Sequence, residues 1–170
     1  MTAQTTPPAG RIPALNWPDA HRCVIQLRYS DLDAMGHVNN ARYAEYLEVS
    51  RIALSQELGL GDVDDLSVLA RLELDYLAEI RLEHELVIET LIERVGRTSW
   101  VTVSRFLADG RPCALARGVQ VSVDEAHQPR ELPQDFAARV APVRVDSFRA
   151  IGGNAVGERP TDPNSEPVRP

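Results

Sequence analysis

The feature that most constrains the fold of this 170-residue chain is one long helical segment followed by four consecutive strand-like segments. Between about residues 40 and 58, one face carries Tyr43, Tyr46, Leu47, Ser50, Ala53, Leu54 and Leu58 at 3.6-residue spacing. Asn39 or Asn40 can cap the start of this helix, and Gly59 can end it. We therefore predict a single long helix over 40–58.

Strand-like patterns cover most of the remaining chain. Alternating or β-branched stretches occur at residues 23–29, 67–78, 84–93, 97–108 and 113–123. An Asp-Gly pair within 108–112 predicts a tight hairpin turn between the last two strands. One helix before four consecutive strands cannot form a doubly wound sheet, so the pattern predicts an α+β fold with the helix on one face of an antiparallel sheet. Because one helix cannot cover such a sheet, we expect subunits to pair.

Proline distribution marks the boundaries of the folded domain. Of twelve prolines, only three fall within residues 21–138. We predict an N-terminal extension at 1–20 and a folded domain at 21–140, which a short helix at about 133–139 closes. The stretch 141–170 is rich in Gly, Pro and polar residues and lacks apolar periodicity, so we expect a disordered tail there.

Charge and hydropathy exclude several classes of function. The net charge of −7 argues against broad binding of nucleic acid. No run of 18 apolar residues could span a membrane, and the N-terminus lacks the apolar run of a secretory signal. We therefore expect a cytoplasmic protein without a nucleic-acid or membrane partner. Cys23 and Cys113 lie among apolar residues, which predicts two buried free thiols.

The residues with chemical potential gather between positions 28 and 51, in RYSDLDAMGHVNNARYAEYLEVSR. Asp31 and Asp33 precede the predicted helix, and Gly36 permits a close bend between them and its start. The free amides at a helix N-terminus can bind an oxyanion. A carboxylate beside such amides is suited to attack on a carbonyl carbon.

Thioester hydrolysis requires no more than these groups. A thiol has a pKa of about 8.5, so it departs without a metal or a strong acid. The acyl carbon needs a carboxylate, or a water that a carboxylate activates, and the oxyanion needs donors. The four histidines are scattered and the two cysteines form no metal-ligand pattern, so we expect neither a metal nor another cofactor.

The stretch RYSDLDAMGHVNNARYAEYLE resembles the signature of the 4-hydroxybenzoyl-CoA thioesterase-like hotdog family. The later stretches VLARLELDYLAEIRLEHELVIE and VGRTSWVTV resemble the same family, and the resemblance spans about residues 22–138. It implies a hotdog fold, in which a five-stranded antiparallel sheet wraps around one long central helix. It also implies dimers with two sheets joined edge to edge, often paired into homotetramers, and activity on acyl-CoA.

The resemblance also implies roles for particular residues. By position, Asp33 is the catalytic carboxylate and the backbone N–H of Asn40 is a main oxyanion donor. His37 is a third catalytic candidate. The plant acyl-carrier-protein thioesterases carry Asp, Asn and His at the positions of Asp33, Met35 and His37. Because methionine replaces that Asn here, an acyl-carrier-protein substrate gains no support.

Further side chains are candidates for substrate binding, and each has an ordinary structural alternative. Tyr29 and Asn39 flank the loop, and Tyr43 lies on the apolar helix face, where core packing is the alternative. Ser99 resembles a family position near the ligand. The phosphates of CoA need cations, and the strand arginines that could supply them are Arg71, Arg94, Arg97 and Arg105. Of these, Arg71 and Arg97 are our choices.

We interpret the chain as an acyl-CoA thioesterase that forms a homodimer or homotetramer. Asp33 acts as nucleophile or as general base, and the residues leave both routes open. The alternative is a non-catalytic hotdog module that binds acyl-CoA as a sensor. A hotdog dehydratase or hydratase would need a His placed as base beside a carboxylate in a different motif, which this chain lacks.

Overall fold

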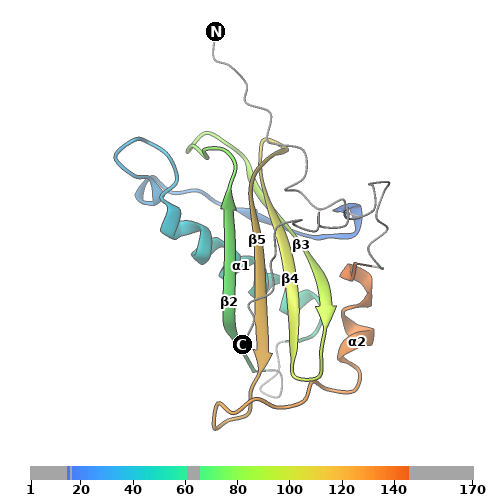
Figure 1. Cartoon of the computed structure of the whole chain (residues 1–170). Coiled ribbons are helices and arrows are strands. Elements are labelled where there is room, and N and C mark those ends of the chain that lie inside the picture. Colours follow the sequence, from blue (N-terminus) through green and yellow to red (C-terminus); the bar gives the residue numbers. More distant parts are fainter. Residues whose placement is uncertain (1–14, 16, 61–65, 146–170) are drawn as a thin grey trace, which may run out of the picture.

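A computed structural model describes residue 15, residues 17–60 and residues 66–145. Within this part, five antiparallel strands form one sheet in the order β1-β3-β4-β5-β2. The strands are β1 (His21–Ile25), β2 (Ser67–Tyr76), β3 (Leu86–Val95), β4 (Ser99–Ala108) and β5 (Arg111–Ser122). The helix α1 (Asn40–Glu57) runs diagonally behind the sheet (Figure 1). This arrangement confirms the predicted α+β hotdog architecture.

The helix α1 begins and ends at residues that the sequence identifies. The side chain of Asn39 caps it by accepting a 3.0 Å hydrogen bond from the amide of Ala41. Gly59 adopts a φ of +64° immediately beyond the helix, the left-handed conformation that favours glycine. The buried residues of the helix, all from the predicted apolar face, are Tyr43, Tyr46, Leu47, Ser50 and Leu54.

The predicted hairpin between the last two strands is also present. Asp109 and Gly110 both have positive φ, at 49° and 75°. A two-residue turn with positive φ at both positions matches the right-handed twist of the strands that it joins. It therefore helps to set the register of β4 on β5.

The first strand is shorter than predicted. It ends at Ile25, whereas alternation suggested a strand over 23–29. The reason is local: the backbone N–H of Arg28 donates to the carboxylate of Asp31, and Tyr29–Asp31 then form a 3-10 turn. As a result Tyr29 leaves the sheet and is 83% exposed.

The C-terminal part of the folded unit extends further than predicted. The short helix α2 (Phe136–Arg139) packs against the sheet through Phe136. The Phe136 ring contacts that of Trp100 in β4, with ring centroids 4.9 Å apart. Val143 is buried, and the amide of Val145 donates to the carbonyl of Ile92. Residues 141–145 therefore belong to the domain rather than to a tail, because an apolar contact and backbone pairing hold them. The rest of the predicted tail lies outside the described residues.

At the other end of the chain, Trp17 is buried within the predicted extension, and residues 1–14 lie outside the described part. Both cysteines are buried and free, as expected. None of the described helices is long and apolar enough to cross a membrane.

One edge of the sheet is exposed and carries several apolar side chains. Among the described strands, β2 has a neighbour on one side only, β5. Its side chains Val68, Leu69 and Tyr76 are 40–45% exposed, and Val49 and Ile52 on the outer face of α1 are each 51% exposed. Natural proteins usually cover or charge such an edge, because it can pair with another strand.

Candidate functional site

The loop before α1 is closed by backbone hydrogen bonds. Leu32 and Val38 form an isolated antiparallel bridge. Inside it, the amide of Asp33 donates to the carbonyl of His37 at 2.8 Å, and the amide of Gly36 donates to the carbonyl of Asp33 at 3.1 Å. Gly36 has a φ of +77°, a conformation that glycine adopts without strain. The loop is therefore a defined turn.

The carboxylate of Asp33 is fixed through one of its two oxygens. Its Oδ1 accepts hydrogen bonds from the amides of Met35, at 2.8 Å, and His37, at 3.1 Å. Within the described residues, Oδ2 has no hydrogen-bond partner, and the residue is exposed. Asp33 thus presents an oriented carboxylate with one oxygen available to a reacting molecule.

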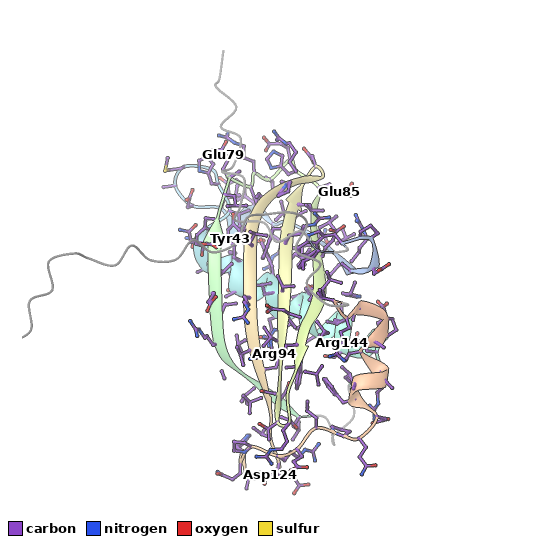
Figure 2. All side chains as sticks on the ribbon, turned by 45° about the vertical axis from the view of Figure 1, so that its right-hand side comes forward. Tyr43, Glu79, Glu85, Arg94, Asp124 and Arg144 are labelled. Atoms are coloured by element: carbon purple, nitrogen blue, oxygen red, sulfur yellow. The ribbon has the colours of Figure 1, made fainter. Side chains whose placement is uncertain are left out.

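A second turn shows that this geometry alone does not make a site. Oδ1 of Asp124 accepts from the amides two and four residues later, Ala126 and Gln128, at 2.9 and 2.8 Å. The amide of Asp124 likewise donates to the carbonyl of Gln128. Figure 2 shows Asp124 at the end of the sheet opposite Glu79 and Tyr43. What distinguishes Asp33 is the helix start that follows its turn.

At that helix start, one amide is unpaired. Asn39 accepts from the amide of Ala41 with its side chain and from the amide of Arg42 with its carbonyl. The amide of Asn40, the first residue of α1, has no acceptor among the described residues. Because the positive end of the helix dipole lies here, this N–H can stabilise an oxyanion. Asn40 is also anchored to the sheet, since the hydroxyl of Tyr76 donates to its carbonyl at 3.2 Å.

Asp31 stabilises the loop from the protein interior. It is fully buried, and its carboxylate accepts from the hydroxyl of Tyr46 at 2.8 Å and the amide of Arg28 at 2.9 Å. Its carbonyl accepts from the amide of Asn39. Burial acts to raise the pKa of Asp31, but the hydrogen bonds from Tyr46 and Arg28 outweigh it and hold the pKa below its ordinary value. Asp31 is therefore a buried, charged residue whose hydrogen bonds hold the loop in place.

His37 contributes its backbone to the Asp33 turn and its side chain to another loop. Its Nε2 lies 3.2 Å from a guanidinium nitrogen of Arg81 and 3.4 Å from a carboxylate oxygen of Glu79. Arg81 can only donate, so its contact requires Nε2 without a proton, whereas the contact with Glu79 requires the proton. The pKa of Glu79 is lowered, mainly by its hydrogen bond from Arg81. No sequence pattern indicated these contacts across more than 40 residues.

The remaining candidates do not gather at the loop: Tyr43 lies beside it, whereas Arg71, Arg97 and Ser99 lie further along the sheet. Tyr43 is buried beside the loop, and its ring contacts those of Tyr76 and Phe106 at centroid distances of 4.9 and 5.2 Å. Arg71 lies midway along β2, exposed and paired with Glu73.

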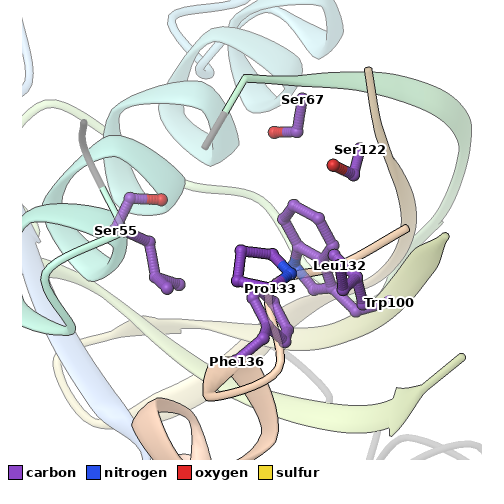
Figure 3. A pocket seen from close by; sticks show the side chains of 8 residues that line it. Ser55, Ser67, Trp100, Ser122, Leu132, Pro133 and Phe136 are labelled. Atoms are coloured by element: carbon purple, nitrogen blue, oxygen red, sulfur yellow. The ribbon is translucent and has the colours of Figure 1, made fainter. Parts of the chain in front are cut away.

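Arg97 and Ser99 lie far from the loop within one chain. Ser99 begins β4 at the end of the sheet where β2 starts, whereas Asn40 lies where β2 ends. Arg97 is exposed, pairs with Glu131, and accepts the amide of Leu132 with its carbonyl. Leu132 in turn lines a small pocket between Ser55, Ser67, Ser122 and the Trp100 ring (Figure 3). That pocket has no titratable side chain among its lining residues.

A second pocket, which the sequence analysis did not anticipate, lies between α1 and the sheet. Leu47 and Arg51 of α1 face strand residues that include Gly118 and Gln120 of β5. Its signal in the sequence is the polar Gln120, which follows the small residues Ala114, Ala116 and Gly118 on the same face of the strand. Among the described residues, no three His, Cys, Asp or Glu side chains are placed to hold a metal ion together.

Comparison with known proteins supplies independent findings. A family model described as the thioesterase-like superfamily matches residues 27–140. A thioesterase from Thermus thermophilus, solved with coenzyme A and Zn, is 33% identical, over 71% of this chain and 96% of that one, with a TM-score of 0.66. A putative thioesterase from Pseudomonas aeruginosa is 27% identical, over 72% of this chain and 98% of that one, with a TM-score of 0.66. An Asp-to-Asn mutant of a 4-hydroxybenzoyl-CoA thioesterase, complexed with 4-hydroxybenzoyl-CoA, is 15% identical, over 72% of this chain and 99% of that one, with a TM-score of 0.67. At this identity the likeness concerns the fold alone.

Proposed function

This chain belongs to the thioesterase-like superfamily, and on that basis we propose that it hydrolyses an acyl-CoA thioester to a free acid and CoA. The observation that carries the proposal is the exposed carboxylate of Asp33. Two backbone amides hold one of its oxygens, and the same short loop leads to the unpaired amide of Asn40. CoA as the thiol is supported by the Thermus thermophilus relative, which was solved with coenzyme A.

Asp33 can act by either of two routes. As a nucleophile, its free oxygen adds to the acyl carbon, the C–S bond breaks, and the electron pair leaves on the CoA sulfur; water then hydrolyses the mixed anhydride. As a general base, Asp33 takes a proton from water while that water adds to the acyl carbon, and the CoA thiolate again departs. In both routes the amide of Asn40 stabilises the negative charge that develops on the acyl oxygen.

The other predicted residues have secondary roles in this proposal. The backbone amide of His37 orients Asp33, and its side chain ties the loop to Glu79 and Arg81. Asn39 shapes the helix start. In this proposal Tyr29 and Tyr43 would border the acyl group, and Arg71, exposed on β2, would meet a CoA phosphate.

The exposed β2 edge supports a homodimer, which could pair further into a tetramer. Two copies related by a two-fold axis would join their β2 strands antiparallel. The Ser67 end of one β2 would then lie beside the Tyr76 end of the other. Arg97 and Ser99, which lie at the Ser67 end, would thereby approach the Asp33 loop of the second copy. The predicted substrate contacts of both residues thus depend on this pairing.

A thiol-release assay tests the proposed reaction. We expect the purified chain to liberate CoA from part of a panel that runs from acetyl-CoA to palmitoyl-CoA and includes benzoyl-, phenylacetyl- and hydroxybenzoyl-CoA. A thiol-reactive chromophore would report the free CoA. Binding of these thioesters in calorimetry, with no thiol released from any of them, would contradict the proposal and favour the acyl-CoA sensor.

Analytical ultracentrifugation tests the pairing. We expect the wild type to sediment as a dimer or tetramer, and Val68→Lys to weaken the association by about tenfold or more, because a charge on an edge strand opposes pairing. The matched control is Val24→Lys, which places the same charge on β1, the opposite edge of the sheet, where Val24 is 70% exposed. Equal weakening by both variants, or a monomeric wild type at micromolar concentration, would count against β2 as the interface.

A further inference from the structure

The open edge of β2 carries backbone groups that a second strand could use. The amide of Leu77, the residue directly after β2, donates to the carbonyl of Cys113 at 2.9 Å. Residues of an antiparallel ladder alternate between pairing with one neighbour and facing away from it. Counting back from Leu77, the odd-numbered residues of 71–77 therefore pair with β5. The even-numbered residues direct their N–H and C=O groups to the open edge of the sheet (Figure 1).

The two faces of β2 differ in charge. On the helix side, Leu72 and Leu74 pack against the apolar core, and the ring of Tyr76 contacts that of Tyr43. Side chains alternate between the faces of a strand, so the residues in between lie together on the other face. All of them are charged and exposed, and in chain order they are Arg71, Glu73 and Asp75.

Two-fold symmetry restricts how two copies of β2 can meet. Directly opposite residues of an antiparallel pair share a face of the sheet, so they differ by an even number of positions in the chain. The axis must then pass through one residue of β2 rather than between two. Before Arg71 the strand is irregular, because its register on β5 shifts between Leu69 and Arg71. Each choice of axis residue from Arg71 onward fixes every cross-strand pair.

One axis position brings opposite charges together without opposing like charges. An axis at Leu72 places Arg71 of each copy opposite Glu73 of the other. An axis at Arg71 or at Glu73 would place that residue opposite its own copy, and an axis at Leu74 would place Glu73 opposite Asp75. Like charges directly opposite each other destabilise a sheet, whereas opposite charges stabilise it. An axis still closer to the end of β2 would pair fewer residues.

We propose that two copies pair along β2 with the two-fold axis at Leu72, so that Arg71 of each copy lies opposite Glu73 of the other. The inference rests on the pairing of copies proposed above and adds its register. Within one chain, Arg71 and Glu73 already form an ion pair at 2.7 Å. The pairing would extend this contact into a network across the axis. Arginine has five N–H donors, so the network leaves donors for a CoA phosphate.

This register determines which part of the second copy borders the proposed reaction centre. Tyr76 of one copy would lie beside residues 67–69 of the other. The hydroxyl of Tyr76 donates to the carbonyl of Asn40, the residue whose amide is the proposed oxyanion donor. Val68, Leu69 and Tyr76 are each 40–45% exposed in one chain, and the pairing would cover them. The second copy would thus supply an apolar wall beside the start of α1.

Disulfide cross-linking between two co-expressed variants tests the register. With the axis at Leu72, Arg71→Cys in one copy faces Glu73→Cys in the other, at a Cα separation of about 4.5–5.5 Å that a disulfide can span. In either variant alone, the introduced cysteine and its own copy are diagonal neighbours at roughly 7–8 Å. Under mild oxidation we expect the mixture to form covalent dimers in about fivefold or greater excess over either variant alone. Non-reducing electrophoresis measures the yield, and the native Cys23 and Cys113 are buried.

The single variants report the competing registers. An axis at Arg71 would cross-link Arg71→Cys with itself, and an axis at Glu73 would do the same for Glu73→Cys. Either result would overturn the proposal. So would a wild type that sediments as a dimer while the two variants form no cross-link in any combination.

Charge reversal provides a second measurement. Arg71→Glu and Glu73→Arg should each weaken the association by about tenfold or more, because each change places like charges opposite each other on both sides of the axis. The double variant restores opposite charges there, so it should associate more tightly than either single variant. Sedimentation over a dilution series measures the three dissociation constants. A double variant as weak as the single ones would contradict the register.

These outcomes are distinguishable from failure of the earlier proposals. A dimer with another register would reject this inference alone. A wild type that stays monomeric at micromolar concentration would reject the pairing together with its register. Only the absence of thiol release, which is measured separately, rejects the proposed reaction.

Discussion

Replacing Asp33 with asparagine is expected to lower kcat for acyl-CoA hydrolysis by about 10²- to 10⁴-fold while the fold stays intact. The side-chain oxygen of asparagine can still accept from the amides of Met35 and His37, so the turn keeps its geometry. The second oxygen, however, becomes an NH₂ group. That group can neither attack the acyl carbon nor take a proton from water.

The chain offers a closely matched control for this change. Asp124 forms the same turn, with its carboxylate bonded to the amides two and four residues ahead, but it lies at the opposite end of the sheet (Figure 2). Asp124→Asn should therefore leave kcat within about twofold of the wild type. Thiol-release assays and circular dichroism on both variants measure the comparison. Near-normal turnover in Asp33→Asn would defeat the assignment, and equal losses in both variants would point to a general effect on the fold.

The order of helix and strands was predictable because each depends on a pattern within a few residues. The 3.6-residue spacing of Tyr43, Tyr46 and Leu47 places them on one face of any helix, and burial follows. The Asp109–Gly110 turn is equally local, since few residue pairs accept two positive φ values. The family resemblance then added the hotdog arrangement of these elements and the prediction that two sheets join edge to edge.

The end of β1 was not predictable from alternation. Tyr29 continues the apolar period, but the carboxylate of Asp31 offers the Arg28 amide a better partner than a neighbouring strand does. A hydropathy pattern does not show whether a backbone amide will bond to a nearby side chain or to a neighbouring strand.

The candidate site was predictable only as far as its chemistry is local. The loop sequence predicts a carboxylate beside a helix start, and the family resemblance then selects Asp33 and Asn40 as candidates. The contact of His37 with Arg81 and the separation of Ser99 from the loop depend on strand order, which one sequence does not specify. The Gln120 pocket depends on Arg51 reaching across from α1, a contact between residues 69 positions apart.

Asp31→Ala is expected to lower the free energy of unfolding by about 3 kcal/mol, the lower end of the range for breaking a buried ion pair. The substitution removes the acceptor for the buried Tyr46 hydroxyl and for the Arg28 amide. It also leaves a small void below the loop. The lower end applies because the guanidinium of Arg28 is largely exposed and can return to water. Urea unfolding at one fixed protein concentration measures the difference.

The difference in free energy of unfolding between the wild type and Asp31→Ala should depend on pH. Because the pKa of Asp31 is lower in the folded chain than in the unfolded one, its charge stabilises the fold at pH values above the unfolded value of about 3.9. This contribution fades as the pH falls below that value and through the lower pKa of the folded state. The gap between the wild type and Asp31→Ala should therefore be full at pH 7 and narrow in acid. Asp33→Asn, a change at an exposed carboxylate, should show no gap at pH 7. A gap for Asp31→Ala that stays constant from pH 7 into acid would mean that packing alone, rather than the buried charge, braces the loop that carries Asp33.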